Sequence, residues 1–115
     1  MNTFRLALAG IIVFGSTLPI FANAESVDVK YRGLVDLAPF QCEWLSRSSF
    51  IKRLCYDAKE QYVVVNLTGI YYHYCEVPGN IVSGWRQVES MGRYYNSRVK
   101  GRFDCRVFRV PTYNR

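Results

Sequence analysis

The stretch YVVVNLTGIYYHYCE, residues 62–76, decides the fold. Valine and tyrosine dominate it on both sides of Thr68-Gly69, which predicts two strands joined by a two-residue turn. If Leu67 pairs with Ile70, the alternating side chains fall into two sets. The face expected to be buried carries Val63, Val65, Leu67, Ile70, Tyr72 and Tyr74, and the opposite face carries Tyr62, Val64, Asn66, Tyr71, His73 and Cys75.

A strand and a helix are expected on either side of this hairpin. Residues 50–56 are apolar and aromatic enough for a preceding strand. Within residues 80–90, Ile81, Trp85 and Val88 recur at helical spacing. The helix is expected to begin near Pro78, which suits a first helical turn, with Asn80 as its N-cap. It is expected to stop at Gly92.

These elements predict an α+β fold, a small antiparallel β-meander with one helix packed on one face and two disulfides. The helix is expected to cover the face that carries Tyr72 and Tyr74. Residues 25–47 show no sustained pattern and are expected to form an extended N-terminal arm. Residues 106–110, RVFRV, suit a short edge strand.

The first 24 residues have the features of a secretory signal peptide. Arg5 precedes an uncharged run at residues 6–21, and Ala22-Asn23-Ala24 gives the small-residue pattern of a cleavage site near Ala24. The alternative, an uncleaved anchor, is disfavoured because the run is short of the roughly 20 residues that span a bilayer. We expect a periplasmic or secreted protein with no transmembrane segment in the mature chain.

Four cysteines, Cys42, Cys55, Cys75 and Cys105, follow the cleavage site, and an even number in an exported chain indicates two disulfides. Their spacing includes no CxxC pair, so neither a metal site nor a cofactor is expected.

The meander limits how these cysteines can pair. Cys55 and Cys75 lie on strands separated by a third, about 9.6 Å apart, whereas a disulfide needs Cα atoms within about 7 Å. This disfavours Cys55–Cys75 and the complementary Cys42–Cys105. The two other pairings remain open.

Positive charge is concentrated at the C-terminal end. Residues 25–85 hold six basic and seven acidic side chains, whereas residues 86–115 hold eight basic and two acidic ones, a balance of +6. Aromatic residues lie between these charges, as in proteins that bind polyanions. The alternative is a solvated face that only keeps the protein soluble.

The order of several short motifs resembles the KTSC domain, named after its occurrence at the C-terminus of some lysyl-tRNA synthetases and also found as a stand-alone bacterial protein. The resemblance implies a domain at residues 48–106, followed by a basic C-terminal tail at 107–115. Two departures are Tyr95 in place of the usual phenylalanine and the cysteines Cys55 and Cys75. The matching motif residues are Ser48, Ser49, Tyr56, Asp57, Tyr72, Tyr74, Val77, Pro78, Gly92, Arg93, Tyr94, Tyr95 and Asn96.

The resemblance brings no established chemistry, and RNA binding is suggested only by the association with synthetases. We expect a non-catalytic binding module for an unknown macromolecule, such as a polyanion or an envelope protein. The alternative is nucleic-acid or polyanion binding through the basic C-terminal region. The candidate binding residues are Tyr71, His73, Arg93, Tyr94, Tyr95, Arg98, Lys100 and Arg102.

A hydrolytic enzyme is the third hypothesis. Cys75 and His73 lie two residues apart on one strand face and would have to act as nucleophile and base. A cysteine among four in an exported chain is more typical of a disulfide, and the chain has no GxSxG or phosphate-loop motif.

Overall fold

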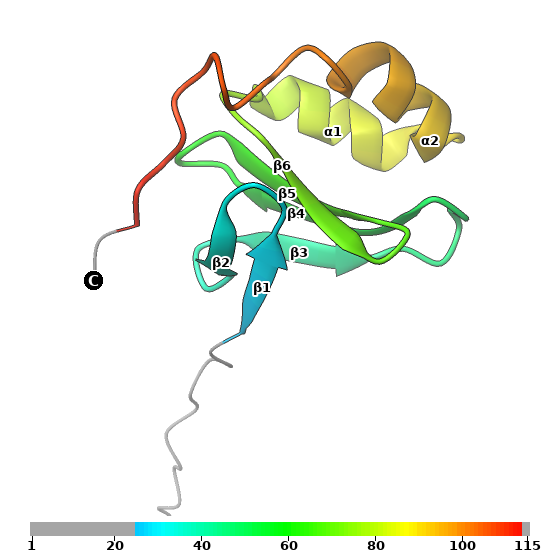
Figure 1. The fold of residues 1–115 in the computed structure, drawn as a ribbon. Helices are drawn as coiled ribbons and strands as arrows, with labels where there is room; N and C mark the ends of the chain where they lie inside the picture. The colour runs from blue at the N-terminus through cyan, green and yellow to red at the C-terminus, as the bar shows by residue number, and fades with distance from the viewer. Residues whose placement is uncertain (1–24, 114–115) are drawn as a thin grey trace, which may run out of the picture.

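The computed structural model describes residues 25–113, which form one mixed sheet with helical segments against one face (Figure 1). The order of strands across the sheet is β2-β1-β6-β5-β4-β3. Neighbouring strands are antiparallel except β1 and β6, which are parallel and pair at Val29 and Tyr71. The strands are β1 (Ser26–Val29), β2 (Gly33–Asp36), β3 (Gln41–Trp44), β4 (Ile51–Asp57), β5 (Tyr62–Leu67) and β6 (Ile70–Tyr74). The α+β class is confirmed.

The β5–β6 hairpin has the predicted register. Leu67 pairs with Ile70, and the pairing continues to Val63 and Tyr74. Thr68 and Gly69 form the turn with φ angles of 51° and 104°. Two central residues with positive φ are what a tight hairpin turn requires, and glycine adopts this conformation without steric cost. The Asn66 side chain completes the turn by accepting a hydrogen bond from the Gly69 N–H at 2.7 Å.

The helical layer covers the predicted face of the hairpin. It consists of α1 (Gly79–Gln87), α2 (Met91–Tyr94) and a π-helix (Tyr95–Val99). Trp85 is fully buried and donates to the Met91 carbonyl at 3.2 Å. The buried residues of this first core are Leu45, Ile51, Leu54, Tyr56, Val63, Val65, Leu67, Val77, Val82, Trp85, Met91, Tyr95 and Val99.

The helix limits differ from those expected. α1 ends at Gln87, its N-cap position is Pro78 rather than Asn80, and Gly92 lies inside α2 rather than stopping a helix. A new helix begins because the Ser90 hydroxyl accepts a hydrogen bond from the Arg93 N–H at 3.3 Å, which satisfies a free N–H of the first turn. The second helical segment was not predicted.

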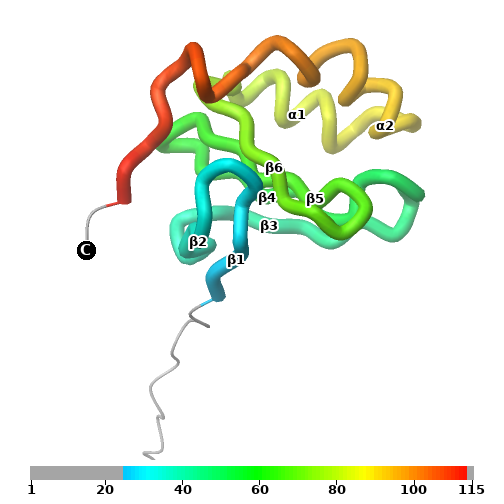
Figure 2. The backbone as a smooth tube through the Cα atoms, in the orientation of Figure 1, coloured from blue at the N-terminus to red at the C-terminus, as the bar shows by residue number. Residues whose placement is uncertain are grey.

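The segment expected as an extended arm, residues 25–47, contains three strands. β1 and β2 form a hairpin, and Figure 2 shows it beside β6 on the side of the sheet away from the helices. Val27, Val29 and Val35 are buried against the second face of the central strands. This second core consists of Val27, Val29, Val35, Leu37, Phe40, Cys55, Tyr62, Val64 and Cys75.

The C-terminal segment is held against the same face without forming the edge strand expected at residues 106–110. Val110 and Tyr113 pack on the second core. The Tyr113 hydroxyl donates to Asp57 at 2.7 Å, and Arg32 donates to the Pro111 carbonyl at 2.7 Å. The part of the expected basic tail up to Tyr113 is therefore packed on the domain.

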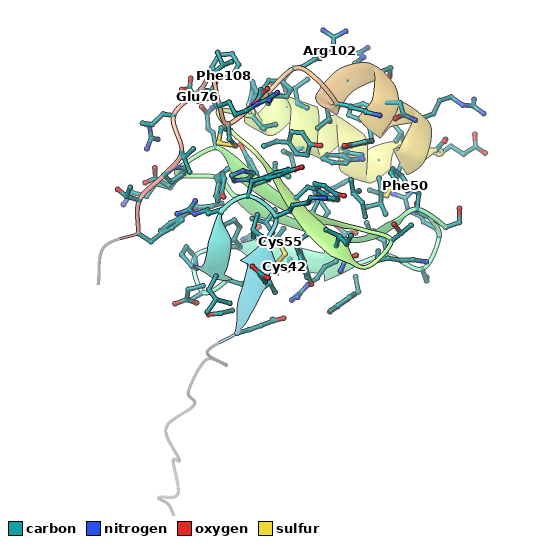
Figure 3. The ribbon with its side chains drawn as sticks, viewed as in Figure 1. Cys42, Phe50, Cys55, Glu76, Arg102 and Phe108 are labelled. Atoms are coloured by element: carbon teal, nitrogen blue, oxygen red, sulfur yellow. A yellow bond between two sulfur atoms is a disulfide. The ribbon has the colours of Figure 1, made fainter. Side chains whose placement is uncertain are left out.

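Two disulfides join Cys42 to Cys55 and Cys75 to Cys105. Cys42 and Cys55 are direct partners across β3 and β4, with Cα atoms 4.0 Å apart, and Figure 3 shows them side by side. The disfavoured Cys55–Cys75 bridge is absent, because β5 separates β4 from β6. The structure selects one of the two pairings that the sequence left open.

No helix between residues 25 and 113 is long and apolar enough to cross a membrane. The expected signal peptide, residues 1–24, lies outside the described residues.

A glycine inside α1 allows the two helical segments to approach each other. A Cβ at Gly84 would lie 2.7 Å from the Tyr94 hydroxyl, which donates to the Ile81 carbonyl at 2.8 Å. We expect Gly84→Ala to lower the free energy of unfolding by about 1–2 kcal/mol, because overpacking and the lost hydrogen bond outweigh the better helix propensity. Urea denaturation measures the change.

Gly79→Ala is the matched control, since a Cβ at Gly79 meets nothing within 4 Å. It should leave stability unchanged or raise it by up to about 1 kcal/mol. Equal stability of the two variants would contradict the close packing of α1 on Tyr94.

Candidate functional site

A cleft of about 810 Å³ opens between the β1–β2 turn, β6 and the segment that follows the π-helix. Its size is within the range of ligand sites, about 300–1,000 Å³. These elements are distant in sequence and meet because the Lys30 N–H donates to the Tyr71 carbonyl at 2.8 Å and Cys75 is bonded to Cys105. The lining residues are Lys30, Tyr31, Arg32, Tyr72, His73, Tyr74, Lys100, Gly101, Asp104, Cys105, Arg106 and Val110.

The charges that line the cleft are mainly positive. Arg106 holds Asp104, the one carboxylate in the lining, through an ion pair of 2.7 Å and a backbone hydrogen bond, and together they hold the Asp104 pKa at about 2. Arg32 lies over the Tyr62 and Tyr113 rings. Within residues 25–113, no carboxylate forms an ion pair with Lys30 or Lys100. The free charge of the cleft is therefore cationic.

His73 lines the cleft and is fixed by β5. Its Nδ1 lies 2.8 Å from the Tyr62 hydroxyl, and the two rings meet edge to face. Burial lowers the His73 pKa, and the nearby Arg32 guanidinium lowers it further, whereas Asp104 acts in the opposite direction. His73 is therefore neutral at pH 7, and the cleft gains another positive charge only in acid.

The other candidate residue of the same strand face, Tyr71, has a structural role. Its ring packs against the second core, and its hydroxyl accepts a hydrogen bond from Arg53 at 3.2 Å. Arg53 also binds both carboxylate oxygens of Glu25, which lowers the Glu25 pKa. Tyr71 therefore contributes to the attachment of the N-terminal strand.

The tyrosines expected to stack on a ligand near the C-terminus lie within the helical layer. Tyr95 is 5% exposed, meets Phe50 edge to face and shares a hydroxyl–hydroxyl hydrogen bond with Tyr74. Tyr94 is half-buried and stacks on Trp85. Tyr95 is therefore mainly a core residue with little ring surface for a ligand, and its role in stacking stays a prediction.

The basic candidates are exposed. Arg93, Arg98 and Arg102 extend from α2, the π-helix and the turn that follows, and Figure 3 shows Arg102 at the outer edge of the helical layer. Within the described part of the chain, none of the three forms an ion pair with a carboxylate. Lys100, which lines the cleft, is likewise exposed and has no carboxylate partner within residues 25–113, and these four residues are called the basic face below.

His73, Cys75 and Cys105 form a group whose potential ligand atoms lie within 4.8 Å of one another. The two sulfur atoms are bonded to each other, so neither offers a thiolate to a metal ion or a substrate while the disulfide is intact. Cys75 is also fully buried. In the oxidised protein, Cys75 and His73 do not form a nucleophile–base pair.

Three further motif residues, Ser48, Tyr56 and Asp57, support the fold. The Ser48 hydroxyl accepts from the N–H groups of Phe50 and Ile51, and Asp57 accepts from two N–H groups in the β4–β5 turn. The Tyr56 hydroxyl donates to the Val77 carbonyl at 2.7 Å, where the chain turns from β6 toward α1.

Sequence reasoning missed half of the cleft. Lys30, Tyr31 and Arg32 lie in the segment expected as an arm, and Asp104 and Arg106 were not selected. Tyr72 was expected in the core, and it is half-buried with one side in the cleft. Alternation in Ser26-Val27-Asp28-Val29 was the one local signal that could have revealed β1.

The fold and the cleft define a small disulfide-linked α+β domain with a ligand-sized site on its surface. The family model of the KTSC domain matches residues 47–103. The crystal structure of a KTSC domain protein from Yersinia pestis is similar, with 26% identity and a TM-score of 0.53 over 56% of this chain and 92% of that chain. The chain belongs to the KTSC domain family. No curated protein matches it.

Both disulfides cross a boundary of the family match. Cys55 and Cys75 lie inside residues 47–103, whereas Cys42 precedes this range and Cys105 follows it. Each bridge therefore links the domain to a segment outside the match. Seven lining residues of the cleft also lie outside it, namely Lys30, Tyr31, Arg32, Asp104, Cys105, Arg106 and Val110. These segments build much of the site.

The lowered pKa of His73 predicts a pH-dependent stability. When the pH falls below 6.5, the ordinary value, His73 of the unfolded chain binds a proton that the folded chain does not bind. The free energy of unfolding should therefore decrease with falling pH until the lowered pKa of the folded state is reached. His73→Asn should lose this component in urea denaturation between pH 7 and about pH 5. An identical slope in both proteins would contradict it.

Proposed function

We propose that this protein is a small exported, non-catalytic binding module that holds a macromolecular partner with an acidic contact surface, in the cell envelope or outside the cell. The observation that carries the proposal is a set of exposed cations, which comprises Arg93, Arg98, Arg102 and Lys100 of the basic face and Lys30 in the lining of the cleft. Its cations lack carboxylate partners within residues 25–113. A binding role needs an accessible surface of this kind, whereas a reaction needs an activated group.

Export is supported by the covalent structure. Two disulfides are typical of proteins that fold in an oxidising compartment. The small domain also benefits from them, because a bridge restricts the unfolded chain and stabilises the fold by about 2–4 kcal/mol.

A non-catalytic role is supported by the state of the reactive groups near the cleft. Cys75 is bonded to Cys105, and His73 is fixed to Tyr62. The Tyr74 hydroxyl is hydrogen-bonded to the Tyr95 hydroxyl. The cleft thus offers charge and ring surfaces for binding rather than an activated nucleophile.

Binding of nucleic acid or another extended polyanion is the second candidate. The three exposed arginines favour it, because phosphate-dominated binding requires cations that are not already neutralised. The small ring surface left for stacking on bases argues against this candidate, since Tyr95 is buried and the Tyr94 ring already stacks on Trp85. Selectivity for bases is therefore not expected.

The salt dependence of binding tests the proposal. The oxidised protein is titrated with a single-stranded DNA oligomer and with polygalacturonate, at several salt concentrations, by fluorescence anisotropy. We expect both polymers to bind, with an affinity that falls steeply with salt. The Arg93→Gln/Arg98→Gln/Arg102→Gln variant should reduce the salt slope for DNA by about 2, since each phosphate contact contributes about 0.7.

The matched control is Lys52→Gln/Lys59→Gln, which removes exposed charges from β4 and the turn after it. It should leave the slope nearly unchanged. Failure of both polymers to bind at low salt, or equal slopes for the arginine variant and the control, would contradict an anionic partner on this face. Much tighter binding of DNA than of polygalacturonate would favour the second candidate.

A further inference from the structure

The cleft continues into a second hollow. This hollow, of about 360 Å³, shares the lining residues Tyr72, Tyr74 and Lys100 with the cleft. It extends to Phe50 and Leu67 at the other end of β6. The two hollows together form a groove along β6, which is basic at the end near the β1–β2 turn and is lined mainly by aromatic and aliphatic side chains at the other end.

Two lysines can hold an acid group in this groove. The Lys30 Nζ lies 5.7 Å from the centroid of the Tyr72 ring, and Lys100 lines both hollows. Neither lysine forms an ion pair in the described range, whereas Arg106 is paired with Asp104 and Arg32 is bonded to the Pro111 carbonyl. Of the four cations in the lining, Lys30 and Lys100 are the two that are exposed and have no carboxylate partner in the described range, whereas Arg32 is half-buried and its Nη1 lacks a hydrogen-bond partner.

Tyr72 gives the groove a flat surface beside these lysines. Its ring is half-buried, lines both hollows and lies below Lys30. A ligand ring that displaces the Lys30 ammonium from this face can pack on Tyr72 while its acid group pairs with the displaced lysine. The cleft is also much larger than a single inorganic anion requires, as its volume of about 810 Å³ is that of a small-molecule site.

We propose that the groove binds a small ring-bearing acid, with the ring against Tyr72 and its carboxylate or phosphate between Lys30 and Lys100. This rests on the proposed function, because the acid would be the terminal unit of the acidic partner. An acidic sugar and an aromatic acid share this chemistry. Lys30 lies outside the family match, and the Cys75–Cys105 bridge fixes the segment on the other side of the cleft. The site is therefore expected in this chain and not in a KTSC domain that lacks these segments.

Isothermal titration calorimetry of the oxidised protein at low salt tests the assignment. The probes are digalacturonate, 4-hydroxybenzoate, the neutral sugar galactobiose and inorganic phosphate. We expect at least one ring-bearing acid to bind, and to bind more tightly than galactobiose or phosphate. Lys30→Gln/Lys100→Gln should weaken this binding by about tenfold or more, because it removes both charge-assisted contacts.

Two controls separate this site from the basic face. Lys30 and Lys100 are exposed, so their variant should keep the near-ultraviolet circular dichroism of the folded protein. The Arg93→Gln/Arg98→Gln/Arg102→Gln variant should bind the ring-bearing acid within about twofold of the unmodified protein.

The assignment is overturned if neither ring-bearing acid binds, if phosphate binds equally tightly, or if the lysine variant retains full affinity. Failure of the small acids while polygalacturonate still binds would reject this site and leave the proposed function in place. Binding of a small acid without polymer binding would support the site and reject the acidic macromolecular partner.

Discussion

The burial of β5 on both faces is the constraint on which the rest of the structure depends. All six of its residues, Tyr62–Leu67, are buried, so each face of the central sheet requires a cover. The helical layer covers one face with Trp85 and Val82. The N-terminal strands and the C-terminal segment cover the other face with Val29, Val35 and Tyr113. One sheet therefore carries a hydrophobic core on each of its two faces.

The segments that cover the second face, called the second cover below, also form much of the cleft. The second cover consists of segments outside the KTSC match, and each is joined to the domain by a disulfide. Where these segments pass the edge of β6, they leave a cleft that contains Lys30 from one side and Asp104 and Arg106 from the other. Stability and the cleft therefore have the same structural origin, because the elements that bury the second face also form the walls of the cleft.

Local patterns were sufficient for the hairpin and its partners. Alternation and the Thr68-Gly69 turn specify the register from Val63 to Tyr74, and helical spacing places Trp85 in the core. The second cover was missed because β1, β2 and β3 have four residues each, too few for a clear period. The apolar run Tyr62–Val65 in β5 was a further signal, since in a strand with one solvated face apolar residues would alternate with polar ones. The cleft could not be predicted, because only tertiary packing brings Lys30 and Lys100 into the lining of one cleft.

The most direct test of the two-sided cover is the disulfide map of the natively purified, oxidised protein. Trypsin places the four cysteines in different peptides, residues 33–47, 54–59, 60–86 and 103–106. Mass spectrometry of a digest kept free of thiol exchange should find peptide 33–47 linked to 54–59, and 60–86 linked to 103–106. A link between 54–59 and 60–86, or between 33–47 and 60–86, would contradict the attachment of both segments to the second face.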